Sequence, residues 1–136
     1  MPIVIDASLT ASWHFEQERN ERSDAILDSL SDDSARVPAI WWFEIRNVIL
    51  LGERGRRATQ EQTSAFLARL VRLPISVAAI PEETRLMDLS RRHRLTFYDA
   101  AYLELAQREA IPLATLDKKL VTAARAEGVP LVLAAR

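Results

Sequence analysis

Near its N-terminus the chain reads Ile3-Val4-Ile5-Asp6-Ala7-Ser8. Three consecutive β-branched residues without polar alternation predict a strand that is buried on both faces of a parallel sheet. The run ends at Asp6, and Ser8 is placed to cap a helix that starts near Leu9. Ligands of open α/β sheets bind beyond the carboxyl ends of the strands, so Asp6 stands where a functional residue is expected.

Length and composition indicate one soluble domain. With 136 residues the chain can bury about two-thirds of its unfolded surface in one core, which predicts a single domain over residues 1–136. Eighteen basic and 19 acidic residues give a net charge of −1, so no global attraction to nucleic acid is indicated. The absence of cysteine suits a reducing compartment, and neither a signal peptide nor a membrane-spanning run is apparent. We therefore expect a cytoplasmic protein without a membrane partner.

Segments of helical periodicity alternate with short apolar runs along the rest of the chain. This alternation predicts a parallel α/β sheet with helices on both faces. Capping patterns mark helix starts, among them the capping box of Thr59 with Gln62 and the cap at Thr96. The expected strands are residues 3–5, 36–37, 75–80, 113–115 and 129–133, and the expected helices are residues 12–30, 40–54, 59–71, 81–94, 97–109 and 117–128.

Residue inventory excludes two kinds of site. The chain has only three glycines, Gly52, Gly55 and Gly128, which are too few and too scattered for a phosphate-binding loop or a dinucleotide fingerprint. Its two histidines, His14 and His93, are isolated, and we interpret them as surface or helix-end residues rather than as members of a triad or zinc site. Carboxylates at the ends of the expected elements are the remaining candidates.

Three aspartates flank expected strands at their carboxyl ends, and two roles are open for each of them. Asp6 and Asp117 precede expected helices, and Thr96-x-x-Asp99 has the form of a capping box, so all three could simply be helix caps. Alternatively, they are parts of one site, in which Thr115 orients the carboxylate of Asp117. Taken one at a time, these residues do not distinguish the two roles.

Glu44 is expected on the apolar side of its helix, between Val48 and Leu51. A carboxylate on a buried face is costly unless another group compensates it. Arg46 points away from Glu44, and Asn47 could donate a hydrogen bond to it without neutralising its charge. Either Glu44 reaches solvent or an arginine from elsewhere, or it belongs to a functional site; we favour the functional role.

The four acids together suggest a cation site. In a doubly wound sheet, strand ends and helix starts of this kind meet at one edge. Two carboxylates about 4 Å apart repel each other by about 4 kcal/mol at an effective dielectric constant of 20, and several such pairs would rival the ~5–15 kcal/mol net stability of a domain. Either some of these acids stay protonated or a hard cation lies among them. All-oxygen ligands favour Mg²⁺ or Mn²⁺, and such a site suits phosphoryl chemistry.

Four motifs occur in order along the chain: residues 3–8, Glu44-Ile45-Arg46-Asn47, residues 96–106 and residues 113–120. Each is weak alone, but the ordered set, with Tyr-Asp-Ala-Ala-Tyr at residues 98–102 and Ala-Thr-x-Asp at residues 114–117, is specific at these spacings. Over its whole length, the chain resembles a PIN-domain ribonuclease of the VapC toxin type.

The resemblance implies a three-layer α/β/α fold with a five-stranded parallel sheet in the order 3-2-1-4-5 and Asp6 on the central strand. It also implies a Mg²⁺- or Mn²⁺-dependent endoribonuclease that leaves 5′-phosphate and 3′-hydroxyl ends. The catalytic and metal-binding acids that it implies are Asp6, Glu44, Asp99 and Asp117, with Ser8, Asn47 and Thr115 as supporting polar residues.

RNA as substrate, a cognate antitoxin as inhibitor and a homodimer are the partners that the resemblance implies. Two basic clusters are candidate phosphate contacts, although helix-end charges and a solvated loop need no such role. An acidic site without metal would also accept an arginine of the inhibitor. The candidate RNA contacts are Arg54, Arg56 and Arg57 in one loop and Arg91, Arg92, His93 and Arg94 in another. Residues that could form either a partner surface or part of the core are Trp13, Trp41, Trp42 and Phe43.

Two other functions remain open at this level. A magnesium-dependent phosphatase of the haloacid dehalogenase type also begins with an apolar strand that ends in aspartate. Such an enzyme needs a second acid two residues later, where this chain has Ser8. A non-catalytic PIN-like scaffold that binds proteins is the other alternative, and it would not require all four acids.

Overall fold

The computed structural model describes residues 1–132, and its strands form one parallel sheet in the order β3-β2-β1-β4. The first strand is an inner strand of this sheet, next to β2 with the pair Ile3↔Ala35 and next to β4 with the pair Val4↔Leu113. All of its residues are buried, which explains why its sequence is apolar without alternation. The strands are β1 (Ile3–Ile5), β2 (Ala35–Val37), β3 (Ile75–Val77) and β4 (Leu113–Ala114).

The expected fifth strand is reduced to a single bridge in the described residues. Leu131 pairs in parallel with Leu113, and the N–H of Val132 donates to the carbonyl of Leu113. The carbonyl of Pro130 accepts a hydrogen bond from the N–H of Leu113. Because proline has no N–H of its own, it cannot donate a further hydrogen bond to β4. Residue 133 of the predicted strand lies outside the described residues. Residues 1–132 therefore contain four strands rather than five, in the predicted order.

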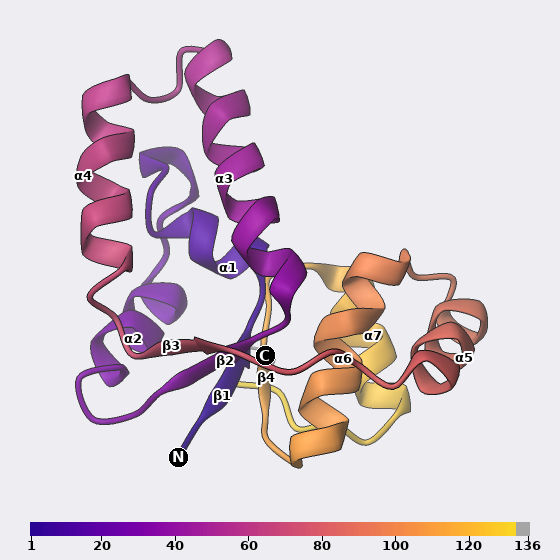
Figure 1. The fold of residues 1–136 in the computed structure, drawn as a ribbon. Coiled ribbons are helices and arrows are strands. Elements are labelled where there is room, and N and C mark those ends of the chain that lie inside the picture. Colours follow the sequence, from indigo (N-terminus) through magenta and orange to yellow (C-terminus); the bar gives the residue numbers. More distant parts are fainter. Residues whose placement is uncertain (133–136) are drawn as a thin grey trace.

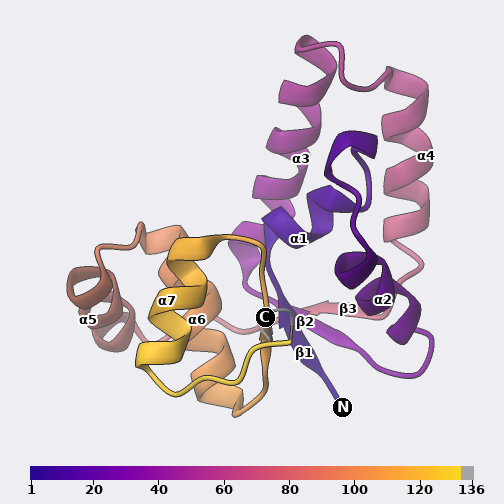
Figure 2. The ribbon, with the colours of Figure 1, turned by 180° about the vertical axis from the view of Figure 1, so that it is seen from behind.

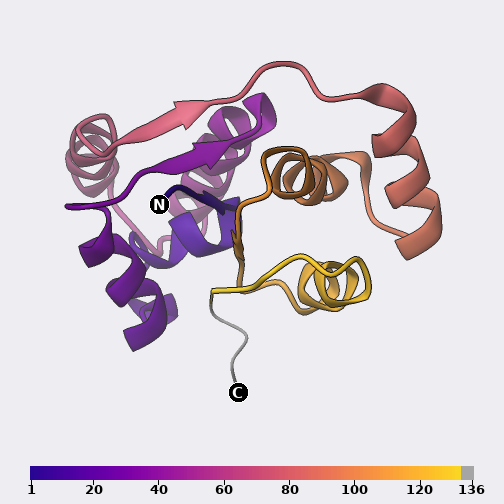
Figure 3. The ribbon, with the colours of Figure 1, turned by 90° about the horizontal axis from the view of Figure 1, so that it is seen from below.

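Helices cover both sides of the sheet (Figures 1 and 2). The helices α1 to α4 gather on one side of the strands, where α3 and α4 stand as a hairpin, and α5 to α7 form a cluster on the other. Seen from below, α6 and α7 lie next to β4 (Figure 3). The helices are α1 (Ala7–Ser12), α2 (Glu21–Ser29), α3 (Ala39–Arg54), α4 (Gln60–Leu70), α5 (Glu83–His93), α6 (Phe97–Glu109) and α7 (Lys118–Ala126), with one 3₁₀ turn, η1 (Glu16–Glu18).

The single helix predicted over residues 12–30 is wrong. The chain forms α1, the turn η1 and then α2, because Asn20 starts a new helix by accepting a hydrogen bond from the N–H of Ser23. The buried indole of Trp13 donates to the carbonyl of Ser23 at 2.8 Å, which holds the start of α2 against the end of α1. At the other end of α1, Asp6 rather than Ser8 is the N-cap.

Smaller differences concern helix ends and strand length. Gly52 lies inside α3, where its missing Cβ makes room for the ring of Phe15, instead of ending the helix. Helix α5 begins after Glu82, whose side chain caps it, so Pro81 stays outside. β3 stops at Val77 rather than at residue 80. The predicted capping box at Thr59, the cap at Thr96 and the left-handed Gly128 after α7 are confirmed.

The core separates the aromatic residues into two groups. Trp13 and Trp41 are buried, so they belong to the core and not to a partner surface. Trp42 is 47% exposed and Phe43 64% exposed, and they stack edge to face on the outside of α3. Within residues 1–132, no helix is both long enough and apolar enough to cross a bilayer.

Candidate active site

Asp6 is fixed at the end of β1 by several donors. The residue is only 5% exposed, and its carboxylate accepts hydrogen bonds from the hydroxyl of Ser8 at 2.8 Å and from the N–H of Leu9 at 2.9 Å. The hydroxyl of Thr115 donates to the other carboxylate oxygen. Asp6 thus caps α1 and also faces the residues that follow β4, so the two roles considered for it are compatible.

The segment between β4 and α7 is attached to β1 through the same hydroxyl groups. The N–H of Asp117 donates to the hydroxyl of Thr115 at 3.0 Å, and the N–H of Leu116 donates to the hydroxyl of Ser8 at 3.2 Å. Asp117 caps α7 by accepting from the N–H of Lys119. Parallel pairing of β1 with β4 therefore brings Asp117 to the same sheet edge as Asp6.

Two helices supply the remaining acids. Asp99 lies in the first turn of α6, which begins at the Thr96 cap, and Tyr102 follows one turn later. Helix α3 presents Glu44 from the opposite side, next to its buried face. The phenol of Tyr102 donates to a carboxylate oxygen of Glu44 at 2.5 Å and so joins α6 to α3.

All four predicted acids line one cavity of about 260 Å³ beyond the carboxyl ends of β1 and β4. The acids come from four separate regions of the chain, so only the fold brings them together. The residues that line this cavity, called here the acid cavity, are Asp6, Ala7, Ser8, Ala11, Glu18, Glu44, Val48, Asp99, Tyr102 and Asp117.

Burial and mutual repulsion disfavour ionisation of the carboxyl groups. Burial, with a smaller contribution from the charge of Asp117, raises the pKa of Asp6 to about 6 against the lowering effect of its hydrogen bonds. Burial and then Asp117 raise the pKa of Asp99, and burial and then Asp99 raise the pKa of Glu44. Burial and the carboxylate of Glu44 likewise raise the pKa of Tyr102, so its phenol stays protonated. The acid cavity therefore concentrates negative charge at a cost to the fold.

The supporting residues behave differently from one another. Ser8 and Thr115 both bind the carboxylate of Asp6. Asn47 is exposed, and within the described residues no hydrogen bond joins it to Glu44, whose partner is Tyr102 instead. Tyr102 was missed from sequence, although its position three residues after Asp99 places it on the same helix face.

Glu18 is a further acid that sequence analysis missed. It lines the acid cavity from η1 and pairs with Arg57, whose guanidinium also lies 4.2 Å from the centre of the Phe15 ring. No local pattern could reveal this placement, because it depends on the unexpected break between α1 and α2.

The donor chemistry of the acid cavity suits a hard divalent cation. Its ionisable donors are carboxylates, with neither thiolate nor imidazole among the lining residues, and repulsion among them would be relieved by positive charge. Within residues 1–132, however, no three His, Cys, Asp or Glu side chains already stand together as a coordination group. The acids share a cavity without forming a preassembled set of ligands.

The predicted RNA contacts lie in different surroundings. Arg57 adjoins the acid cavity through Glu18. Arg92, near the end of α5, forms ion pairs with Asp88 of the same helix and with Glu127 at the end of α7. Of the other candidate contacts, His93 pairs with Glu127. Exposed side chains without ion pairs among the described candidates are Arg54, Arg56, Arg91 and Arg94.

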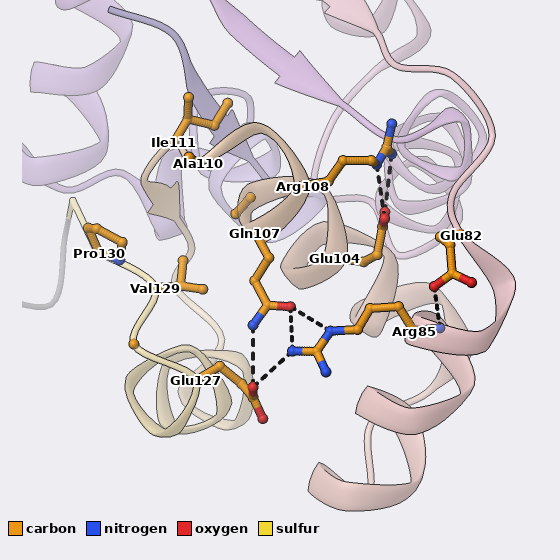
Figure 4. A pocket seen from close by; sticks show the side chains of 12 residues that line it. Glu82, Arg85, Glu104, Gln107, Arg108, Ala110, Ile111, Glu127, Val129 and Pro130 are labelled. Carbon is orange, nitrogen blue, oxygen red and sulfur yellow. Dashed lines mark hydrogen bonds and ion pairs between the residues drawn. The ribbon is translucent and has the colours of Figure 1, made fainter.

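A larger cavity, of about 770 Å³, lies among α5, α6 and α7 and contains none of the four acids (Figure 4). Its charged groups are already paired. Arg85 contacts both Gln107 and Glu127, and Arg108 forms a bidentate pair with the buried Glu104. We interpret these hydrogen bonds and ion pairs as structural contacts that hold α5, α6 and α7 together.

The fold is a parallel α/β domain with an acidic cavity at one edge of its sheet, and comparison with known proteins identifies its family. Residues 3–126 match the PIN domain, and the chain belongs to this family. It is similar to Ribonuclease VapC3 from Pyrobaculum aerophilum, with 29% identity over 126 residues that cover 88% of this chain and 92% of that protein.

Solved structures share this fold. PAE2754 from Pyrobaculum aerophilum superposes with a TM-score of 0.73 at 20% identity, covering 97% of this chain and 92% of that one. VapC20 from Mycobacterium tuberculosis, a sarcin-ricin loop cleaving toxin, gives a TM-score of 0.61 at 16% identity, with coverage of 89% and 94%. The resemblance to VapC-type PIN-domain proteins and the predicted α/β class of the fold are confirmed.

Proposed function

We propose that this protein is a metal-dependent endoribonuclease and the toxin of a toxin–antitoxin pair. The observation that carries the proposal is the single cavity lined by Asp6, Glu44, Asp99 and Asp117. Membership of the PIN family and similarity to a ribonuclease over most of the chain support it. RNA is the proposed substrate, and the cytoplasm is the proposed compartment.

The proposed cofactor is Mg²⁺ or Mn²⁺, held by Asp6, Asp99 and Asp117, with Glu44 as a further ligand or as the holder of the attacking water. When bound, such an ion would activate water and offset the charge that develops on the phosphate oxygens. The hydroxyl groups of Ser8 and Thr115 keep the carboxylate of Asp6 in place as a ligand.

Local rather than global positive charge would guide RNA to the acids. Of the candidate contacts, Arg57 adjoins the acid cavity, and Arg54 and Arg56 share its loop. Arg91 and Arg92 form a second candidate contact at the end of α5. Phosphate contacts make binding depend on salt, so charge reversal at Arg56 and Arg57 should weaken RNA binding and flatten its salt dependence.

The proposed protein partners are a cognate antitoxin and a second copy of the chain. Trp42 and Phe43 are large exposed aromatics on α3, directly before Glu44, and side chains of this type are enriched in interface cores. We propose that they contribute to one of these two interfaces. An arginine of the antitoxin entering the acid cavity would neutralise carboxylates that otherwise repel one another.

Incubation with total RNA tests the proposed function. The protein is mixed with RNA in Mg²⁺ or Mn²⁺, and new 5′ ends are mapped. We expect discrete cleavage that leaves 5′-phosphate and 3′-hydroxyl ends, loss of cleavage in Asp99→Asn, and normal cleavage in Asp32→Asn, which changes an exposed aspartate of the loop after α2.

Circular dichroism and melting of both variants control for folding. Absence of cleavage by the wild-type protein, together with absence of Mn²⁺ binding, would favour the non-catalytic scaffold instead. Cleavage by Asp99→Asn at the wild-type rate would remove Asp99 from the mechanism.

A further inference from the structure

Tyr102 is a buried polar residue that none of the roles above employs. It is 1% exposed and lies among the buried residues 100–106 of α6. Its phenol lines the acid cavity and points its hydrogen-bond donor at Glu44. A buried hydroxyl needs a partner, and here the partner is one of the four acids.

Glu44 needs such a donor because nothing else in the described residues holds its carboxylate. It is only partly covered, and its helix neighbour Asn47 faces solvent. The charge of Asp99 acts against the ionised form of Glu44. A long, repelled side chain at the edge of a cavity would turn toward solvent unless a specific bond retained it.

The position of Tyr102 links two of the acids. Asp99 and Tyr102 are three residues apart on α6, so they share one face of a helix that is buried over residues 100–106. Through its hydrogen bond to Glu44, Tyr102 fixes the position of the Glu44 carboxylate on α3 relative to the Asp99 carboxylate on α6. A phenol is ordinarily protonated near neutral pH, so Tyr102 is the donor in this bond.

We infer that Tyr102 is a positioning residue, which holds Glu44 in the acid cavity through its phenol hydroxyl. This inference rests on the proposed function, since Glu44 is assigned there to the metal or to the attacking water. Removal of a residue that orients a metal ligand typically lowers metal affinity or activity about 10- to 100-fold.

The substitution Tyr102→Phe tests this role, because it removes the hydroxyl and keeps the ring. We expect Mn²⁺ affinity, measured by calorimetry, to fall about 10-fold, and kcat for RNA cleavage to fall about 10- to 100-fold with little change in KM. The matched control is Tyr98→Phe, because Tyr98 lies one turn earlier on the same helix and is 56% exposed. This variant should match the wild-type protein in both Mn²⁺ affinity and kcat.

A double substitution separates positioning from a structural role. In the Glu44→Gln background, Tyr102→Phe should produce no further loss of Mn²⁺ affinity, because the carboxylate that it positions is gone. Wild-type Mn²⁺ affinity and kcat in Tyr102→Phe, or an equal additional loss in the Glu44→Gln background, would overturn the inference. Failure of the proposed function is distinct, since the wild-type protein itself would then neither bind Mn²⁺ nor cleave RNA.

Discussion

A hydrogen bond from the hydroxyl of Thr115 to the carboxylate of Asp6 joins two residues that are 109 positions apart in the chain. The same hydroxyl accepts from the N–H of Asp117, so one threonine relates two of the four acids to each other. Parallel pairing of β1 with β4 makes this contact possible. The acid cavity is therefore a product of strand order and not of any local motif.

Thr115→Val should impair the acid cavity while leaving the fold intact. Valine keeps the β-branched shape but leaves Asp6 without one donor and the N–H of Asp117 without its acceptor. We expect a loss of about 1–3 kcal/mol of unfolding free energy and about 10-fold weaker Mn²⁺ binding. Denaturant unfolding measures the change in unfolding free energy, and calorimetry measures the change in Mn²⁺ affinity. The control is Thr122→Val on the exposed face of α7. Unchanged Mn²⁺ affinity would show that the Thr115 contact is not needed by the site.

Asp6 should make the metal-free protein less stable as the pH rises. Its pKa is about 6 in the folded protein against an ordinary 3.8, so the folded state binds this proton more tightly and loses stability between about pH 4 and pH 6. The difference between the two pKa values corresponds to about 3 kcal/mol.

The variant Asp6→Asn cannot ionise and should escape this loss. We expect its melting temperature in EDTA, relative to wild type, to rise between pH 4 and pH 7 by several degrees. If the difference in melting temperature between Asp6→Asn and wild type stays constant over this pH range, ionisation of Asp6 does not destabilise the folded protein.

Glu127 should have the opposite dependence on pH. Its hydrogen bond with His93, followed by its contacts with Arg92 and Gln107, outweighs burial and lowers its pKa to about 2. The stabilisation is thus complete above the ordinary pKa of 4.5 and is lost as the pH falls toward 2. Glu127→Gln should cost about 2 kcal/mol at pH 7 and progressively less below pH 4.5, as measured by denaturant unfolding. A cost that is equal at pH 7 and pH 3 would contradict this explanation.

Gly52→Ala should destabilise the protein, because a Cβ there would lie 2.3 Å from the ring of Phe15. Phe15 is buried between α1 and α3 and cannot move without disturbing the core. We expect a loss of about 1–3 kcal/mol in denaturant unfolding. Gly55→Ala is the matched control, since its nearest contact would be 3.4 Å away and its backbone is in an ordinary conformation. Equal stability of the two variants would contradict the proposed steric clash.

Local patterns and strand order could be predicted from the sequence, including the caps at Thr59 and Thr96. The apolar run of β1 and the alternation of elements suggested that the four acids could meet at one sheet edge. The structure has them lining one cavity, and only the fold brings them together there. Ser8 and Thr115 were implied as supporting residues by the family resemblance, and in the structure both donate to the carboxylate of Asp6. Thr115, which was considered as orienting the carboxylate of Asp117, instead accepts from the N–H of that residue.

Long-range packing could not be predicted in the same way. The break after α1 depends on the indole of Trp13 reaching α2, and the placement of Glu18 depends on that break. Asn47 was considered as a hydrogen-bond donor to Glu44 because it is adjacent on the same helix. The donor in the structure is Tyr102 of α6, which follows Glu44 by 58 positions in the chain. The contacts of Trp13, Glu18 and Tyr102 therefore depend on packing between helices, which the spacing of residues in the sequence does not determine.

Calorimetric titration with Mn²⁺ at pH 7.5 tests most directly whether the four acids act together on one cation site. We predict that the wild-type protein binds Mn²⁺ and that each single amide variant at Asp6, Glu44, Asp99 and Asp117 binds at least 10-fold more weakly, while Asp32→Asn binds like wild type. No binding by the wild-type protein, or wild-type affinity in the four variants, would contradict the central claim.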